Sequence, residues 1–485
     1  MRGPVCLACD LAGARRRPGL LAKAPTGHLS NPWTRARASQ PKYDPRHALD
    51  SHDLKILVLT LGSRGDVQPY VALGQGLRAA GHDVSICTSE HFAAFITAHG
   101  LDYRHMNNGF VDLIGSMEGR AAIAGLDNLL GTLRVMASML PRVGPLQVET
   151  LQDAWCAAQA VQPDLILFHP KIPGAVDIAD ALGVPVIMAP LFPQYVATGE
   201  FPTLGFPALP FGAGYRRGTY HLVHWLAGRI GGGPIRRWRC NNAMAPRPAA
   251  LGLFTDAAGH PIPVLHGYST VVSARPTDWP ETAVVAGAWS LAAPGDWLPQ
   301  AALLEFLAAG PPPVYVGFGS MAGRDPTRVT RIVLEALRLS GRRGLLALGW
   351  GGLDPPALPP DVMAIDQAPH DWLFPQVAAV VHHGGAGTTE AALRAGKPSV
   401  VCPFFGDQPF WGRRVHTLGA GPAPIPQKRL TAGRLAAAIR EAATDPSMSD
   451  AAEALGRRLR REHGVASTVR WIERWMAARV DGASQ

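Results

Sequence analysis

Runs of apolar residues with no polar alternation recur along the first half of the chain. The run 55–60 is followed by a Gly-rich turn at 62–66 and by a helical pattern from Pro69 to Arg78. A strand that is apolar on both sides is typical of a parallel sheet covered by helices on both faces, so the pattern predicts a β-α-β unit. The strands predicted in this half are 55–60, 83–88, 164–168 and 184–188.

A second series of buried strands begins beyond residue 313, and amphipathic helical patterns at 432–444 and 448–477 follow it. Between the two series, residues 193–265 are rich in Pro, Gly and aromatic residues. We expect an irregular insertion with short helical patches there, of the kind that carries a binding surface or a lid. The strands predicted in the second half are 314–318, 344–348, 362–365, 378–382 and 399–402.

Two β-α-β series in 485 residues favour an α/β protein with two domains. We predict two Rossmann-like parallel-sheet domains that face each other across an interdomain cleft. The expected parts are a disordered extension at 1–52, an acceptor-binding domain at 53–292, a linker at 293–312, a nucleotide-sugar-binding domain at 313–455 and a carboxy-terminal helix at 456–485 that packs back on the first domain.

The formal net charge of +9 does not indicate a nucleic-acid partner, because most of it lies in one terminal segment. Residues 1–50 hold nine Lys and Arg against three Asp, a net charge of +6, which leaves +3 for the rest. A basic run interleaved with aromatic residues is missing from the remainder. The sequence contains no uninterrupted run of about 18 apolar residues, so it predicts no membrane-spanning helix.

The six cysteines are scattered and indicate neither a disulfide framework nor a zinc site. Cys6 and Cys9 form a single CxxC pair without a second pair, and Cys87 and Cys402 lie in apolar runs. This usage favours a reducing, cytoplasmic compartment. No cluster of metal ligands is visible, so we expect no metal and no cofactor.

Three Gly-rich turns follow predicted strands, at 62–66, 317–320 and 382–389. Ligands of open α/β sheets bind at the carboxyl ends of the strands, where helix N-termini favour anions. The third turn, His-His-Gly-Gly-Ala-Gly-Thr-Thr, precedes a helix expected from Glu390 to Ala395. Its glycines let the backbone approach a diphosphate, and Thr388, Thr389 and one histidine add donors.

The same turn carries a resemblance to a known family. Residues 383–389, with 368–375 before them and 403–411 after them, resemble the donor-site signature of the UDP-glycosyltransferase superfamily, glycosyltransferase family 1 with the GT-B fold. Residues 62–69 resemble the amino-terminal motif of its sterol 3-beta-glucosyltransferase branch. The resemblance covers 54–475 and is weakest in 110–160 and 195–265.

Membership would imply an inverting glycosyltransferase that moves a hexose from a nucleotide diphosphate sugar, with UDP-glucose expected, to a hydroxyl of a lipophilic acceptor such as a sterol, hopanoid or polyketide. The ribose contact stays open, because Ala391 stands where plant members have Glu, one residue after Glu390. The implied donor residues are Ala368 for the base; Ser320, His383, Gly385, Gly387, Thr388 and Thr389 for the diphosphate, with Ser63 and Arg64 from the other domain; and Asp407 and Gln408 for the hexose hydroxyls.

The general base implied by the resemblance is Asp66, which stands where many relatives have histidine. A carboxylate is a weaker base than imidazole, so we expect burial or a neighbour to raise its pKa. His169, at the end of the strand 165–168, is the expected catalytic partner. The alternative roles are a helix cap for Asp66 and a structural histidine for His169. The helix N-terminus together with His383 would take the place of a cation at the diphosphate.

Two other functions remain open on the sequence alone. A nicotinamide-dependent oxidoreductase would use the same scaffold, but residues 62–65 do not form its Gly-x-Gly-x-x-Gly fingerprint. A noncatalytic nucleotide-sugar or lipid binder would share the fold. Arg236, Arg237 and Arg239 beside Trp238 are interpreted first as a solvated basic face, with a peripheral contact with an anionic membrane as the alternative.

Overall fold

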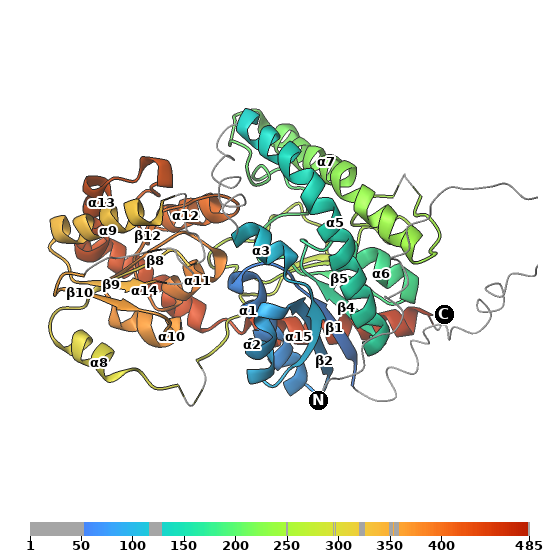
Figure 1. Cartoon of the computed structure of the whole chain (residues 1–485), viewed down its shortest axis with the longest axis horizontal. Helices are drawn as coiled ribbons and strands as arrows, with labels where there is room; N and C mark the ends of the chain where they lie inside the picture. The colour runs from blue at the N-terminus through green and yellow to red at the C-terminus, as the bar shows by residue number, and fades with distance from the viewer. Residues whose placement is uncertain are drawn as a thin grey trace, which may run out of the picture. The chain divides into compact units, whose positions relative to one another are not determined.

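The computed structural model describes residues 53–115, 129–248, 251–293, 295, 297–319, 325–348, 353 and 358–483. The expected extension at 1–52 and the expected diphosphate ligand Ser320 lie outside these ranges. Two parallel sheets, each flanked by helices, make up the described chain (Figure 1). The prediction of an α/β protein built from two Rossmann-like lobes is confirmed.

The amino-terminal sheet has seven parallel strands in the order β3-β2-β1-β4-β5-β6-β7. Its central strand β1 has side chains buried on both faces, as expected for a strand covered by helices on both sides. Four of the strands match predicted ones, whereas β3, β6 and β7 were not predicted. The strands are β1 (Lys55–Leu59), β2 (Asp83–Ser89), β3 (Asp102–Met106), β4 (Leu165–Phe168), β5 (Val186–Met188), β6 (Val264–His266) and β7 (Ala283–Val285).

The carboxy-terminal sheet has five parallel strands in the order β10-β9-β8-β11-β12. All five coincide with predicted strands to within a residue at either end. They are β8 (Val314–Gly317), β9 (Gly344–Ala347), β10 (Val362–Ile365), β11 (Ala379–His382) and β12 (Ser399–Val401).

Helices cover both faces of each sheet. Ile56 and Val58 of β1 pack on one side against α1, α2 and α15, and Leu57 and Leu59 pack on the other against α5, α6 and α7. In the second lobe α9 and α13 cover one face, and α8, α10 and α11 the other. The helices of the first lobe are α1 (Arg64–Ala79), α2 (Ala93–Ala98), α3 (Gly109–Gly115), α5 (Leu129–Val161), α6 (Ala175–Leu182) and α7 (Gly212–Asn241). Those that follow are α8 (Ala301–Ala308), α9 (Pro326–Ser340), α10 (His370–Leu373), α11 (Ala386–Arg394), α12 (Gln408–Thr417), α13 (Ala432–Thr444), α14 (Pro446–Arg460) and α15 (Gly464–Ala483).

The end of the chain forms two helices, α14 and α15, where the sequence pattern predicted one. The break spans residues 461–463, and Gly464, which begins α15, allows the chain to approach the first lobe closely, since a Cβ there would lie 2.2 Å from the carbonyl oxygen of Ala288. Helix α15 then packs against α1 in the first lobe, where Trp289 Nε1 donates a 2.8 Å hydrogen bond to Thr468 Oγ1 (Figure 1). The expected linker at 293–312 contains a helix, α8.

The region predicted to be irregular holds the 30-residue helix α7. Its seven glycines and Pro234 lower its intrinsic helix propensity, and the prediction failed because packing overrides propensity here. Tyr220, Ile235 and Trp238 are buried, and α7 lies along α5 (Figure 1). Among the described helices, these two long ones included, none combines the length and apolar character needed to cross a membrane.

A buried ion pair fastens the carboxy-terminal end of α7 to α6. Arg239 Nη1 lies 2.6 Å from Asp177 Oδ1, and Arg247 Nη1 lies 3.8 Å from Asp177 Oδ2 and 2.9 Å from Asp180 Oδ2. The Asp177 side chain is 2% exposed and both arginine side chains are 12% exposed. The attraction between these charges therefore offsets the hydration that they lose on folding.

Replacing Asp177 by Asn should destabilise the first lobe by about 3 kcal/mol, because it leaves buried arginines without their main carboxylate. Thermal unfolding followed by circular dichroism measures the change. Glu335→Gln, in an exposed pair with Arg338, is the matched control and should leave the unfolding temperature unaltered. Equal unfolding temperatures for both variants would show that the ion pair does not hold α7.

Candidate active site

The strand order of each sheet reverses at one point, and the predicted site residues lie at these two points. In the first lobe β1 lies beside β4, so the loop before α1 faces the loop that carries His169. In the second lobe β8 lies beside β11, which brings the turn at 317–319 next to the turn at 382–388. Such reversal points are where open α/β sheets bind ligands.

Helix α1 begins at Arg64, five residues earlier than the predicted start at Pro69. Ser63 is the N-cap, and Asp66 Oδ2 accepts hydrogen bonds from Ser63 N at 2.7 Å and from Ser63 Oγ at 3.0 Å. This capping box starts the helix, and Pro69 is accommodated inside it at the loss of one backbone hydrogen bond. The capping alternative for Asp66 is therefore correct for one of its two carboxylate oxygens.

The second oxygen of Asp66 faces a cation that was not predicted. Lys171 Nζ lies 2.8 Å from Asp66 Oδ1, and His169 Nε2 lies 3.5 Å from the same oxygen. Burial by itself raises the pKa of Asp66. Lys171, His169 and the surrounding hydrogen bonds lower it by more, so the net pKa lies below the usual value. The expectation of a raised pKa was wrong, because Lys171, His169 and the hydrogen bonds to the carboxylate together outweigh desolvation.

His169 lies beside Asp66, with Nε2 3.5 Å from Asp66 Oδ1, beyond the length of a good hydrogen bond, while its other ring nitrogen is committed. Its Nδ1 accepts a 3.1 Å hydrogen bond from the backbone N–H of Lys171, so the ring proton is assigned to Nε2, which faces Asp66. The ring is 1% exposed, and burial lowers its pKa to about 3, so it is neutral at pH 7. His169 has no free lone pair for a substrate proton. It therefore positions Asp66, and Lys171 supplies the charge.

Gly62 leaves the space that the ion pair occupies. Its φ of 140° suits glycine, and a Cβ there would lie 2.2 Å from Asp66 Oδ2 and 2.7 Å from Lys171 Nζ. Lys171 could have been found in the sequence as a charged residue three positions beyond the end of β4. No pattern in the sequence indicates that its side chain turns toward Asp66.

In the second lobe, α11 begins at Ala386, inside the Gly-rich turn and not at Glu390 as predicted. No side chain caps this end, so the first backbone N–H groups of α11 have no partner within the helix. Gly384 has a φ of 91°, and a Cβ there would lie 2.6 Å from Val401 Cγ1. This uncapped N-terminus lies where the turn predicts an anion site.

The two histidines of the turn differ in their roles. His382 is buried, and its Nδ1 accepts a 3.0 Å hydrogen bond from Gly384 N, which fixes the turn. His383 Nδ1 is buried without a hydrogen-bond partner among the described residues, and Gly319 lies beside the ring. Burial lowers the pKa of His383 to about 4. At pH 7 its ring is therefore neutral and can act only as a hydrogen-bond donor. That the helix N-terminus together with His383 takes the place of a cation at the diphosphate stays a prediction.

The remaining diphosphate residues lie at the same turn. Gly385 is the N-cap of α11, Gly387 is exposed and Thr388 is half-buried in its first turn. Thr389 is buried, and its hydroxyl donates a 2.9 Å hydrogen bond to the carbonyl of Gly385. The proton of Thr389 therefore holds the turn together, and Thr388 offers the hydroxyl for a ligand.

Asp407 and Gln408 begin α12, beside the same turn. Asp407 Oδ2 accepts a 2.8 Å hydrogen bond from Trp411 Nε1. Burial raises the pKa of Asp407 to about 6, and the Asp66 carboxylate adds to the effect. This effect means that Asp66, the predicted base, lies close enough to Asp407, a predicted hexose contact of the other lobe, for the two carboxylates to interact. Gln408 is buried, and its Oε1 accepts from Phe404 N and Phe405 N, which leaves its amide nitrogen for a ligand.

Arg64 connects the two lobes at the nucleobase loop. Its Nη1 donates a 3.0 Å hydrogen bond to Gln367 Oε1, and its guanidinium lies 5.0 Å from the centre of the Phe95 ring. Gln367 precedes Ala368, the predicted base contact in the loop after β10. Arg64 thus holds the base loop against the first lobe, in addition to any contact with a diphosphate.

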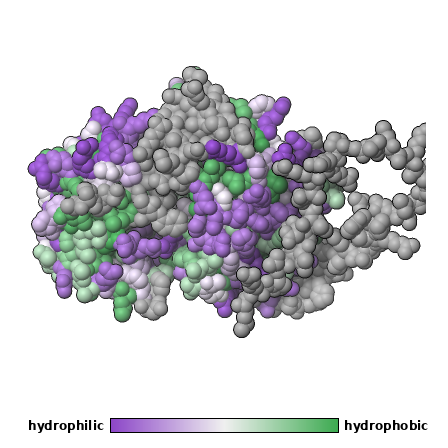
Figure 2. Space-filling view, in the orientation of Figure 1, coloured by the Kyte–Doolittle hydropathy of each residue, from purple (hydrophilic) through white to green (hydrophobic). Residues whose placement is uncertain are grey.

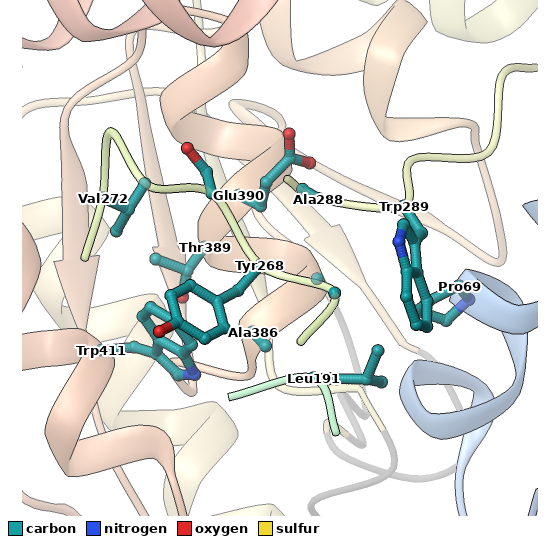
Figure 3. Close-up of a pocket in the computed structure, with 13 residues that line it drawn as sticks. Pro69, Leu191, Tyr268, Val272, Ala288, Trp289, Ala386, Thr389, Glu390 and Trp411 are labelled. Carbon is teal, nitrogen blue, oxygen red and sulfur yellow. The ribbon is translucent and has the colours of Figure 1, made fainter. Parts of the chain in front are cut away.

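A cavity of about 480 Å³ lies between the lobes (Figure 3). Tyr268 and Trp411 lie on one side of it, and Trp289 and Pro69 lie on the other. Of the predicted residues only Gly387 and Thr389 line this cavity, so it adjoins the donor turn without containing the Asp66 cluster. Glu390 also lines it, but its carboxylate bonds Arg394 and Ser290. The ribose contact stays open.

A second cavity, of about 270 Å³, lies within the first lobe beside the ion pair. Leu151 of α5, Ile172 of the loop after β4 and Ile235 of α7 supply apolar walls, and Lys171 is its charged residue. Part of this space is open to solvent, and Lys171 Nζ at its edge lies 2.8 Å from the Asp66 carboxylate.

Two family models match the chain, one in each lobe. Residues 56–198 match the glycosyltransferase family 28 N-terminal domain, and residues 352–463 match the erythromycin biosynthesis protein CIII-like C-terminal domain. The chain is similar to a sterol 3-beta-glucosyltransferase of Emericella nidulans, at 34% identity over 94% of this chain and 32% of the relative. It is also similar to one of Arabidopsis thaliana, at 36% identity over 86% of this chain and 65% of the relative. The chain thus spans about a third of the fungal protein and just under two thirds of the plant protein.

Solved structures share the fold. The glycotransferase of kitacinnamycin superimposes with a TM-score of 0.61 at 22% identity, covering 86% of this chain and 98% of that one. The glycosyltransferase VinC in complex with dTDP gives a TM-score of 0.57 at 19% identity, covering 87% and 99%. These matches do not favour the oxidoreductase alternative. The glycosyltransferase family 28 model in the first lobe, the CIII-like model in the second and relatives matched along most of the chain show that it belongs to the UDP-glycosyltransferase superfamily with the GT-B fold, and that its sequence is similar to sterol 3-beta-glucosyltransferases.

Proposed function

We propose that this chain is an inverting glycosyltransferase that moves a hexose from a nucleotide diphosphate sugar to a hydroxyl of a lipophilic acceptor. UDP-glucose is the expected donor, and a sterol-like molecule is the expected acceptor. The observation that carries the proposal is the arrangement of an ionised Asp66 in one lobe opposite Asp407 and the uncapped N-terminus of α11 in the other.

The donor would lie with its diphosphate on the N-terminus of α11. The unpaired N–H groups of the first turn favour an anion, and His383 Nδ1 and the Thr388 hydroxyl can donate to it. The published complex of VinC contains dTDP, which supports a nucleoside diphosphate at this turn in a protein of the same fold. The nucleotide sugar is a substrate, and no separate cofactor takes part in the proposal.

In the transfer step, the acceptor oxygen attacks the anomeric carbon and its proton passes to Asp66 Oδ1. The bond from the anomeric carbon to the diphosphate oxygen breaks, and its electron pair leaves with the nucleoside diphosphate. The N–H groups of α11 and His383 stabilise that charge. Attack from the side opposite the leaving group inverts the anomeric centre. Asp407 Oδ1 and the amide of Gln408 would hold hexose hydroxyls.

The second cavity supports a lipophilic acceptor. Its walls are apolar, and it opens beside Lys171, so an acceptor hydroxyl could approach Asp66 while the rest of the molecule remains among apolar side chains. The relatives from Emericella nidulans and Arabidopsis thaliana are named sterol 3-beta-glucosyltransferases, which supports a sterol-like acceptor. The four cysteines in the described ranges are free, in keeping with the proposed cytoplasmic location.

Replacing Asp66 by Asn should lower kcat/KM by about 10² to 10⁴-fold, the usual contribution of a general base. The amide can still accept a hydrogen bond from Ser63, so the cap of α1 and the affinity for UDP should persist. Turnover with UDP-glucose and a sterol, read by mass spectrometry, and UDP titration calorimetry measure the two effects. Asp450→Asn on exposed α14 is the control. Undiminished transfer by the Asp66 variant would show that Asp66 is not the base. A wild-type protein that binds UDP but neither transfers nor hydrolyses the donor sugar would be a noncatalytic nucleotide-sugar binder.

Replacing Lys171 by Met should move the acid limb of the pH dependence of kcat/KM to higher pH. Lys171 lowers the pKa of Asp66, and without it burial raises that pKa, so the carboxylate becomes protonated at a higher pH. Lys171→Arg keeps the cation and should retain the wild-type profile. An unchanged acid limb in the Met variant would show that Lys171 does not control the protonation of Asp66.

A further inference from the structure

Exposed apolar side chains gather on one segment of the first lobe. Eight large hydrophobic side chains are exposed in the described part of the chain, and five of them lie between residues 209 and 226. Phe211 is 69% exposed, Trp225 57% and Leu222 45%, and Leu209 and Leu226 complete the set. In Figure 2 hydrophobic and hydrophilic residues lie side by side at the position of α7. Apolar clusters of this kind mark interaction surfaces.

The same segment carries positive charge without negative charge. Helix α7 has six arginines and neither Asp nor Glu. Three of the arginines are engaged within the lobe: Arg216 with backbone carbonyls, Arg217 with Asp278 and Arg239 with Asp177. The other three are exposed and have no carboxylate partner in the ranges that the structure describes. They are Arg229, which lies 5.1 Å from the centre of the Trp225 ring, Arg236 and Arg237.

We propose that this surface docks on an anionic lipid bilayer. The α7 stripe consists of Leu209, Phe211, Leu222, Trp225, Leu226, Arg229, Arg236 and Arg237. Tryptophan, leucine and phenylalanine enter the boundary between headgroups and acyl chains, and arginines pair with lipid phosphates. Trp238 and Arg239, which the sequence suggested for such a contact, do not take part, because Trp238 is buried and Arg239 pairs with Asp177.

Charge disfavours the other occupants of the α7 stripe. A second copy packed symmetrically on it would bring three unpaired arginines of each copy together. Residues 1–50 of the same chain carry a net charge of +6 and would be repelled. An anionic bilayer satisfies both the arginines and the apolar side chains.

The inner side of the same helix lines the second cavity. Gly231 and Ile235 of α7 face that space, with Lys171 among the other lining residues. The buried pair of Arg239 with Asp177 holds this end of the helix in place. A bilayer at the α7 stripe therefore places membrane lipids one helix away from the cavity. Docking is independent of the proposed function, whereas delivery of an acceptor from the bilayer rests on it.

Vesicle co-sedimentation tests the docking. The full chain should sediment with vesicles of phosphatidylcholine and phosphatidylglycerol and stay in solution with vesicles of phosphatidylcholine alone. The triple variant Leu222→Ser, Trp225→Ser, Leu226→Ser should lose about tenfold or more in vesicle affinity, as should Arg229→Gln, Arg236→Gln, Arg237→Gln. Leu304→Ser with Leu339→Ser, exposed hydrophobic residues of the other lobe, is the matched control and should bind like wild type.

Unfolding temperature and UDP affinity should be the same in all four proteins, which keeps a folding defect apart from a docking defect. Equal sedimentation of the wild type and the apolar variant would overturn the proposal, as would dimerisation of the wild type that the same substitutions abolish. Transfer to a sterol in vesicles should fall in the α7 variants, and transfer to a detergent-solubilised sterol should not. Vesicle binding without transfer to either form would leave docking intact and refute the proposed function.

Discussion

The carboxylate of Asp66 does two things at once, and the arrangement of the first lobe follows from both. One oxygen closes the first turn of α1 through Ser63, and the other meets Lys171 across the reversal point of the sheet. The cap fixes where α1 begins, and the ion pair fixes the loop after β4. Glycine at position 62 leaves room for the Asp66 carboxylate and the Lys171 ammonium to meet, since a Cβ there would clash with both. A carboxylate held in this way is ionised at neutral pH and has little thermodynamic drive to take a proton. In the proposed function, proton transfer would therefore accompany the formation of the new bond.

The second lobe provides for negative charge without a resident cation at the turn. His383 is neutral, and the first N–H groups of α11 stay uncapped because the turn ends in glycine. Each of these groups is polar without a formal charge, so an empty site stores no unpaired cation. The first lobe brings two cationic side chains to the candidate site, Lys171 at Asp66 and Arg64 at Gln367. In the proposed function, the first lobe would activate the nucleophile and the second would stabilise the leaving group.

The sequence predicted the buried strands well because a parallel strand under two layers of helices must be apolar at every position. The strands it missed are of another kind. Strand β3, Asp-Tyr-Arg-His-Met, lies at the edge of its sheet and is partly exposed, and β6 and β7 have three residues each. The site residues at the turns were located from Gly-rich sequence and resemblance, whereas Lys171 and the direction of the Asp66 pKa depend on contacts between distant loops. Helix α7 was not predicted because its glycines lower its intrinsic helix propensity, and the packing that stabilises it is not visible in the sequence.

Helix α15 gives the molecule a connectivity in which the first lobe is built from two separate pieces of sequence, whereas the second lobe is continuous. Val469, Ile472 and Met476 belong to the core that covers β1, although they follow the whole second lobe along the chain. The first lobe is therefore unfinished until α15 has left the ribosome, and a fragment cut between the lobes would expose the side of α1 that α15 covers. The chain passes between the lobes twice, once between β7 and α8 and once between α14 and α15. The lobes are therefore joined by two connections, which restrict their relative movement more than a single linker would.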